Sequence, residues 1–229
     1  MELKPIAHIE TDFPTKFGVP RQSGLVKGLK GRIVFEPEYR DPEALRGLEG
    51  FSHIWLLWDF SEARREGTKW QPTVRPPRLG GNRRMGVFAT RSPFRPNNIG
   101  LSSVRILGIE LHTSEGPVIE VEGADLMDGT PIFDIKPYLA FTDSHPEATG
   151  GFTEQTHGSE HSTDSKRFIF NSKLMSAFDA EHLEALKEIL LSDPRPHYHD
   201  DAERVYAFEF AGNEVKFLIK PNQIEAWIE

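Results

Sequence analysis

The segment FSHIWLLWDF, residues Phe51–Phe60, decides the fold class of this chain. Its apolar run is too continuous for a strand with one wet face, so it predicts a central strand that is buried on both sides. Pro42–Leu48, just before it, has a short helical pattern. Other short runs, rich in Ile, Val or Phe and bounded by Gly, Pro or charged residues, predict further strands: Lys4–Glu10, Arg32–Glu36, Gly86–Arg91, Ser102–His112 and Pro117–Gly123. Many strands with few helices predict a mainly β protein with an antiparallel, barrel-like domain rather than βαβ units.

The strand pattern stops near residue 145. Residues 1–145 are expected to form the barrel-like domain, and the small, polar residues of 146–165 are typical of a linker or flexible loop. Residues 166–229 predict a small α+β C-terminal domain: a strand at Lys166–Phe170, a helix from the N-cap Asp179 to about Leu191, and a hairpin around Gly212 and Asn213. So short a segment is expected to pack on the first domain or on a partner.

Composition limits the classes of function. The 229 residues include no cysteine, which excludes disulfides, thiolate metal sites and cysteine nucleophiles. No apolar run approaches the roughly 18 residues that span a bilayer, and the first residues lack the pattern of a secretory signal. These features predict a cytoplasmic protein with no membrane partner.

Positive charge is concentrated in one stretch of an acidic protein. The formal net charge is −8, yet no Asp or Glu occurs from Gly67 to Ile109, where eight Lys and Arg residues lie. Exposed charges are screened over about 8 Å at physiological salt, so a local basic face can bind a polyanion despite the overall charge. The alternative is that these arginines pair with acidic residues from the rest of the chain.

The loop MGVFATRSPFRPNNIGLS, Met85–Ser102, lies inside that stretch. Arg91 and Arg95 carry planar guanidinium groups that suit carboxylates and phosphates. Pro93 and Pro96 restrict the backbone, so the loop is expected to be stiff. On local physics alone, a binding site and a proline-punctuated surface connection with solvated arginines remain equally open.

Several common sites are not indicated. No G-x-G-x-x-G lies between a strand and a helix, and Leu79–Arg84 lacks the spacing of a phosphate-binding P-loop. His157 and His161 stand four residues apart without further ligands nearby, so no metal site is expected.

Six segments taken together resemble one family. They read VPRQSGLV (19–26), RGLEGFSHIW (46–55), VRPPRLGGN (74–82), GVFATRSPFRPN (86–97), DLMDGTPIFDIKPYL (125–139) and DPRPHY (193–198). In this order they resemble the TsaA-like family and, within it, the TrmO-type tRNA methyltransferases. Asn98 departs from that pattern, since many relatives have a proline there. The linker and the segment Val205–Glu229 match least well.

The resemblance implies an enzyme that uses S-adenosylmethionine on a catalytic β-barrel and acts as a homodimer. Its implied substrate is tRNA at adenosine 37, already carrying an N6-threonylcarbamoyl group, with methylation at the same nitrogen. The implied cofactor residues are Ser23, Gly24, Leu25, Ser61, Glu62, Arg91, Leu101, Asp125, Leu126, Met127 and Asp128. Among them, Arg91 is expected to hold the methionine carboxylate as a bidentate pair.

Roles in catalysis and tRNA binding are expectations as well. Asp128 is the leading candidate for the base that removes the N6 proton, with Lys136 or Tyr138 orienting the acceptor; this rests on their adjacency in sequence. Candidate tRNA contacts are Arg75, Arg78, Arg83, Arg84 and, deeper in the site, Arg95, with Arg195 as a secondary candidate.

Two other readings remain open. One is a non-catalytic RNA-binding module that keeps the basic loops, and the other is a methyltransferase with a small-molecule acceptor. The intact RSPFRPN and DLMDGT segments favour an enzyme, and the density of basic residues favours RNA over a small metabolite.

Overall fold

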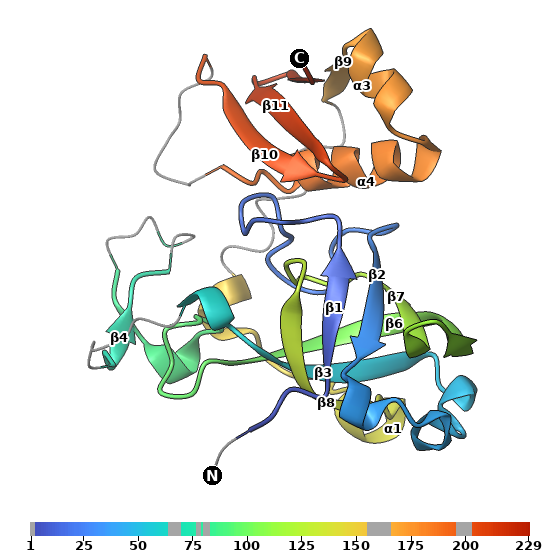
Figure 1. The fold of residues 1–229 in the computed structure, drawn as a ribbon. Coiled ribbons are helices and arrows are strands. Elements are labelled where there is room, and N and C mark those ends of the chain that lie inside the picture. Colours follow the sequence, from blue (N-terminus) through green and yellow to red (C-terminus); the bar gives the residue numbers. More distant parts are fainter. Residues whose placement is uncertain (1–2, 64–69, 77–78, 80–82, 155–165, 196–202) are drawn as a thin grey trace.

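A closed antiparallel barrel forms the first half of the protein (Figure 1). The computed structural model describes residues 3–63, 70–76, 79, 83–154, 166–195 and 203–229. Around the barrel the strand order is β1-β2-β7-β6-β3-β8. These strands are β1 (Ala7–Thr11), β2 (Lys30–Phe35), β3 (His53–Asp59), β6 (Ile99–Thr113), β7 (Gly116–Glu122) and β8 (Thr130–Pro137). The predicted fold class, mainly β with an antiparallel barrel, is confirmed.

Strand β3 is part of the barrel wall and pairs with β6 on one side and β8 on the other. Ile54, Leu56 and Trp58 point into the barrel core, where they are almost fully buried. Trp55 and Leu57 face outward and are half-buried. The expected two-sided burial is therefore only partly right, because alternate side chains of a barrel strand face the core and the exterior.

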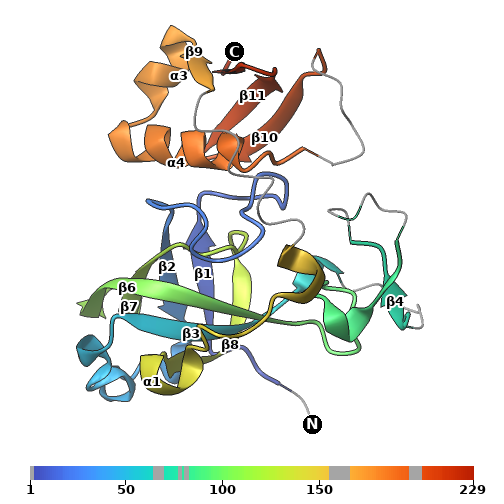
Figure 2. The ribbon, with the colours of Figure 1, turned by 180° about the vertical axis from the view of Figure 1, so that it is seen from behind.

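Strand β6 is the longest strand, and Figure 2 shows it crossing the whole barrel. Gly100, opposite Trp58 in the β3–β6 register, allows the indole to lie flat against the backbone. A Cβ at this position would lie 2.5 Å from both Cδ2 and Cζ2 of Trp58. Only glycine permits so close an approach between a ring and a strand.

The prediction of a strand at Gly86–Arg91 is wrong. Only β5 (Met85–Gly86) is extended, and it forms a small hairpin with β4 (Thr73–Val74) that projects from the side of the barrel (Figures 1 and 2). A 3-10 helix follows at Val87–Ala89. It forms because the side chain of Val87 is buried and because the hydroxyl of Thr90 donates a hydrogen bond to the carbonyl of Val87. Further 3-10 helices in the described residues lie at Pro37–Tyr39, Pro42–Leu45, Leu48–Gly50, Ser61–Ala63 and Gly151–Thr153, and the short α1 spans Ala140–Asp143.

The C-terminal domain is a four-stranded sheet covered by helices. Its strand order is β10-β11-β12-β9, with a parallel β9–β12 pair and antiparallel pairs elsewhere. Asp179 caps the main helix as expected, accepting a hydrogen bond from the backbone N–H of His182. The elements are β9 (Arg167–Phe170), α3 (Ser172–Ala177), α4 (Ala180–Leu191), β10 (Tyr206–Phe210), β11 (Asn213–Ile219) and β12 (Gln223–Trp227).

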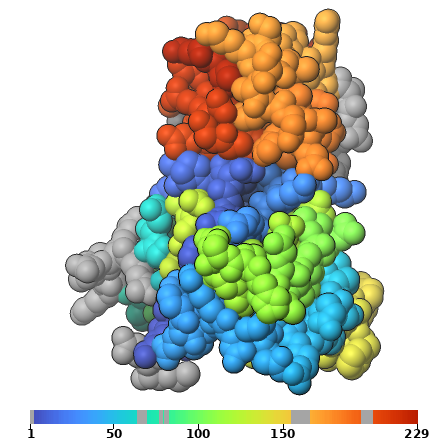
Figure 3. All heavy atoms as spheres, turned by 45° about the vertical axis from the view of Figure 1, so that its right-hand side comes forward, coloured from blue at the N-terminus to red at the C-terminus, as the bar shows by residue number. Residues whose placement is uncertain are grey.

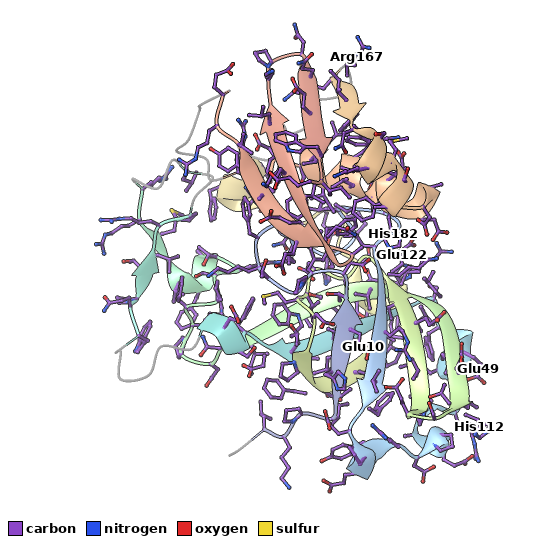
Figure 4. The ribbon with its side chains drawn as sticks, turned by 45° about the horizontal axis from the view of Figure 1, so that its top comes forward. Glu10, Glu49, His112, Glu122, Arg167 and His182 are labelled. Atoms are coloured by element: carbon purple, nitrogen blue, oxygen red, sulfur yellow. The ribbon has the colours of Figure 1, made fainter. Side chains whose placement is uncertain are left out.

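The segment between β1 and β2 joins the two halves of the molecule. Phe13, Val26 and Leu29 are buried in the same cluster as the helices and strands of the C-terminal domain. In Figure 3 this segment forms a layer between the C-terminal domain and the rest of the barrel. His182 lies at the junction (Figure 4), with Nε2 3.5 Å from a carboxylate oxygen of Asp12. The expected packing of the C-terminal domain on the barrel domain is thus present.

Candidate active site

A cleft of about 830 Å³ opens where β3 ends and β6 begins, a volume typical of small-molecule sites. Four loops reach it: the segment after β1, the 3-10 helix after β3, the Met85–Ser102 loop and the turn before β8. Its lining residues include Arg21, Gln22, Trp58, Ser61, Glu62, Arg91, Arg95, Leu101, Asp125, Leu126 and Met127. A cleft at the end of a barrel, lined by several loops, can vary in chemistry without disturbing the fold.

Asp125 is one of the carboxylates that line this cleft. Its Oδ1 accepts a 2.5 Å hydrogen bond from the hydroxyl of Ser102, which in turn accepts one from Trp58 Nε1 at 3.0 Å. Burial raises the pKa of Asp125, while the Ser102 hydroxyl, the positive charge of Arg91 and the backbone N–H of Ser23 act to lower it. The carboxylate is therefore oriented by the barrel wall and has positive potential beside it.

Arg91 and the segment after β1 meet at the cleft. Arg91 donates through Nη1 to the side-chain carbonyl of Gln22. The backbone N–H of Gly24 donates to the carbonyl of Gly123 at 2.9 Å, so this segment is tied to the strand end that leads to Asp125. Gly24 and Gly123 both have positive φ (+74° and +82°), and a Cβ on Gly123 would lie 3.2 Å from the Cα of Gly24. Glycine at both positions permits this contact.

The expected cofactor residues fall into two groups. Ser61, Glu62, Arg91, Leu101, Asp125, Leu126 and Met127 line the cleft together. Ser23, Gly24 and Leu25 lie one to three residues beyond the lining residue Gln22, and only the backbone of Ser23 reaches Asp125. Asp128 is exposed and does not line the cleft; its Oδ1 accepts a 3.0 Å hydrogen bond from the backbone N–H of Thr11.

The structure does not bring Asp128, Lys136 and Tyr138 together. Asp128 precedes β8, whereas Lys136 and Tyr138 lie at its far end; seven steps of about 3.3 Å along the eight-residue strand separate its ends by roughly 23 Å. Lys136 instead forms a 2.7 Å ion pair with Asp134. The ring of Tyr138 lies 5.4 Å from that of Trp55, which lines the cleft. Adjacency in sequence was misleading here because an extended strand carries its two ends apart.

The expected tRNA-binding arginines are not equivalent. Arg75, Arg83 and Arg84 are exposed around the β4–β5 hairpin, where Arg84 donates to the Thr73 hydroxyl at 3.2 Å. Arg95 lines the cleft and donates to the carbonyls of Val87 and Thr90 at 3.2 and 2.7 Å. Arg78 lies outside the described residues.

Arg195 differs from the other arginines because its guanidinium forms an ion pair inside the C-terminal domain. Its guanidinium binds both carboxylate oxygens of Asp193, at 2.8 and 2.7 Å. This side chain is only 13 % exposed, so its main contribution is to the conformation of its own loop.

The sequence did not single out several residues that shape the cleft. Gly100 and Ser102 read as ordinary strand residues, and Gln22 as a loop residue beside more prominent arginines. Gly100 faces Trp58 on the neighbouring strand, and this pairing would have pointed to its role. The pairing can be recognised only once the β3–β6 register is known. Asn98 has a clear role: its amide donates to the Pro93 carbonyl at 2.6 Å and so braces the loop.

Metal-binding groups and membrane-spanning helices are both absent from the described part of the chain. No group of three or more His, Cys, Asp or Glu side chains there could hold a metal ion. Within the same residues, no helix is both long and apolar enough to cross a membrane.

A closed antiparallel barrel with a loop-lined cleft, largely apolar but holding charged side chains, defines a β-barrel protein outside the Rossmann class. Comparisons with known proteins narrow this class. The family model for the tRNA-methyltransferase O N-terminal domain matches residues 8–144, and that for the TrmO C-terminal domain matches residues 170–227. The chain belongs to the TrmO family of tRNA methyltransferases, which confirms the resemblance seen in its motifs.

Individual relatives agree with the family models. The tRNA (adenine(37)-N6)-methyltransferase of Escherichia coli is 41 % identical over 203 residues, covering 88 % of this chain and 85 % of that protein. A Pseudomonas aeruginosa protein provisionally named an S-adenosylmethionine-dependent methyltransferase is 43 % identical over 152 residues, covering 66 % and 63 %. A crystal structure of TrmO superposes with a TM-score of 0.75 at 29 % identity, covering 100 % of this chain and 98 % of that one.

Proposed function

We propose that this protein transfers a methyl group from S-adenosylmethionine to N6 of adenosine 37 in cytoplasmic tRNA. One observation carries the proposal: a chain of the TrmO family has Arg91 and the oriented carboxylate of Asp125 in one cleft of cofactor size. The curated relative from E. coli bears the name of this activity and aligns with most of the chain.

The residues of the cleft fit the proposed cofactor. S-adenosylmethionine carries a carboxylate, a sulfonium and ribose hydroxyls, so its site needs both a cation and an anion. Arg91 offers a fork of N–H donors for the carboxylate, and Asp125 offers an acceptor for hydroxyl or sulfonium groups. Trp58, Leu101 and Leu126 supply apolar lining for the adenine ring.

Methyl transfer does not require the protein to form a covalent bond with the substrate. When bound, S-adenosylmethionine supplies a methyl group on a sulfonium leaving group. The contribution of the chain is alignment of donor and acceptor and exclusion of water, which are large rate effects. The stiff RSPFRPN loop, braced by Asn98 and Arg95, suits this positioning task.

The proton on N6 must pass to a base. We assign this task to a carboxylate of the turn before β8, where Asp125 lines the cleft and Asp128 is the candidate from sequence. A raised pKa makes a carboxylate a better proton acceptor at neutral pH, which favours Asp125. Asn variants at each position distinguish the two: the true base loses turnover with tRNA bound normally, and the other does not.

The proposal also covers the chemical state of the acceptor adenosine and the oligomeric state of the protein. The acceptor is adenosine 37 bearing an N6-threonylcarbamoyl group, as the family resemblance implies. The protein acts as a homodimer, as the family resemblance also implies. Mass measurement in solution by light scattering tests the oligomeric state directly.

The experiment that tests the proposed function has two arms. Calorimetry with S-adenosylmethionine separates an enzyme from a non-catalytic RNA-binding module, which would bind no cofactor. Nucleoside analysis of tRNA from cells lacking the protein separates a tRNA methyltransferase from one with a small-molecule acceptor. The proposal fails if the deletion leaves every methylated nucleoside at its wild-type level.

A further inference from the structure

Two exposed aromatic rings stand together beside the cleft. Phe88 is 70 % exposed and Trp70 is 50 % exposed, and their ring centroids lie 6.1 Å apart with an angle of 33° between the planes. We call this pair the aromatic platform. Large apolar side chains that remain on the surface in such a cluster mark interaction sites.

The platform is held rigidly by its surroundings. Phe88 lies in the 3-10 helix directly after Val87, which is buried and whose carbonyl accepts hydrogen bonds from the backbone N–H and the hydroxyl of Thr90. The N–H of Val87 donates to the carbonyl of Pro72 at 2.9 Å, joining this turn to the segment that carries Trp70. Arg95 donates to the Val87 carbonyl from the other side. A ring displayed on so stiff a turn loses little entropy on binding.

A positively charged side chain lies against the platform, and another lies on the hairpin beside it. The guanidinium of Arg95 lies 5.7 Å from the centroid of the Phe88 ring, while Arg84 is exposed on the adjoining hairpin. The sequence has no acidic residue from Gly67 to Ile109. Aromatic rings flanked by arginines are the combination that binds single-stranded nucleic acid, since bases stack on the rings and phosphates pair with the cations.

The charge also argues against a second copy of the chain as the occupant. In a two-fold dimer whose axis passes through the platform, the platform would meet the same patch of its partner. Arg84 and Arg95 of one copy would then face the arginines of the other, which is unfavourable. An unpaired base with its phosphate has complementary charge.

The position of the platform indicates which base it binds. Arg95 contacts Phe88 on one side and lines the cleft on the other, so the platform is separated from the cleft by a single side chain. An adenosine whose N6 enters the cleft must leave the stack of its neighbours in the RNA. We infer that Phe88, with Trp70 beside it, stacks an unpaired base of the anticodon loop next to the adenosine that is methylated. This inference rests on the proposed function.

The test compares Phe88→Ala with Phe88→Trp and with the control Phe141→Ala. Phe141 is 88 % exposed but lies on α1, away from the β4–β5 hairpin (Figure 1). The affinity of each variant for tRNA bearing N6-threonylcarbamoyladenosine is measured across salt concentrations, together with S-adenosylmethionine affinity and mass in solution. Loss of one base–aromatic stack weakens tRNA binding about 5- to 150-fold. The expected slope of affinity against salt is unchanged, because no phosphate contact is lost.

The expected pattern is a loss in Phe88→Ala, restoration to within about threefold in Phe88→Trp, and no change in Phe141→Ala, with cofactor affinity and mass constant. Wild-type tRNA affinity in Phe88→Ala would overturn the inference while leaving the methyltransferase activity intact. A change from dimer to monomer in Phe88→Ala would overturn it in favour of an interface between copies. Absence of tRNA methylation by the wild-type protein would instead refute the proposed function.

Discussion

Replacing Gly100 by alanine tests how the barrel wall shapes the cleft. The new Cβ would lie 2.5 Å from two atoms of the Trp58 indole, so the ring must move. Overpacking of this kind costs about 1–3 kcal/mol. Displacement of Trp58 also breaks its hydrogen bond to Ser102, at about 0.5–1.5 kcal/mol. Together these predict that the free energy of unfolding falls by about 1.5–4.5 kcal/mol.

The matched control is Gly108→Ala on the same strand. At Gly108 an added Cβ meets only Glu120 Oε2 at an ordinary 3.7 Å, so its effect on stability is expected to be within about 1 kcal/mol. For a chain of this size, 1 kcal/mol corresponds to about 2–4 °C in melting temperature, so Gly100→Ala is expected to melt roughly 3–18 °C below wild type.

Cofactor binding supplies the second readout for Gly100→Ala. Ser102 orients Asp125, so a displaced Trp58 also weakens binding of S-adenosylmethionine in calorimetry at a temperature where the variant is folded. The reasoning is refuted if Gly100→Ala melts within 1 °C of Gly108→Ala and binds the cofactor as tightly as wild type.

Three further predictions concern charged side chains. Arg91→Ala is expected to weaken S-adenosylmethionine binding about 10- to 150-fold in calorimetry, since a charge-assisted hydrogen bond contributes about 1.5–3 kcal/mol; unchanged affinity would remove Arg91 from the site. Burial raises the pKa of Asp125 above its unfolded value, so its ionised form costs stability above the folded-state pKa, and that cost disappears as the pH falls. Asp125→Asn should therefore melt above wild type at pH 8, with a difference that shrinks towards pH 4; a constant or growing difference contradicts this. Arg84→Ala should lower the salt slope of tRNA binding by about one unit, whereas Arg46→Ala, paired with Glu43 on the barrel, should leave it unchanged.

Most of the fold could be predicted because each element has a local signal. The short runs of Ile, Val and Phe in Arg32–Glu36 and Pro117–Gly123 identify barrel strands, and Asp179 identifies the start of α4. Strand β8 was harder, because its sequence TPIFDIKP begins and ends near prolines. The 3-10 helix at Val87–Ala89 was missed because a buried Val87 and a capping Thr90 depend on tertiary contacts.

The site could be predicted only in part, for a similar reason. Arg91 and Asp125 stood out as charged residues within recognisable segments, and the structure brings them to one cleft. The separation of Asp128 from Tyr138 depends on the direction of β8, which the sequence does not reveal. The role of Gly100 depends on the β3–β6 register, and the platform of Trp70 and Phe88 on how a hairpin folds against a 3-10 helix.

The central claim is that this chain methylates N6 of adenosine 37. Its most direct test is to incubate the purified protein with isotopically labelled S-adenosylmethionine and a tRNA bearing N6-threonylcarbamoyladenosine at position 37, then digest the RNA and analyse the nucleosides by mass spectrometry. We expect one labelled methyl group on that nucleoside and none on a tRNA with guanosine at position 37. Label on another nucleotide, or no label although the cofactor binds, would contradict it.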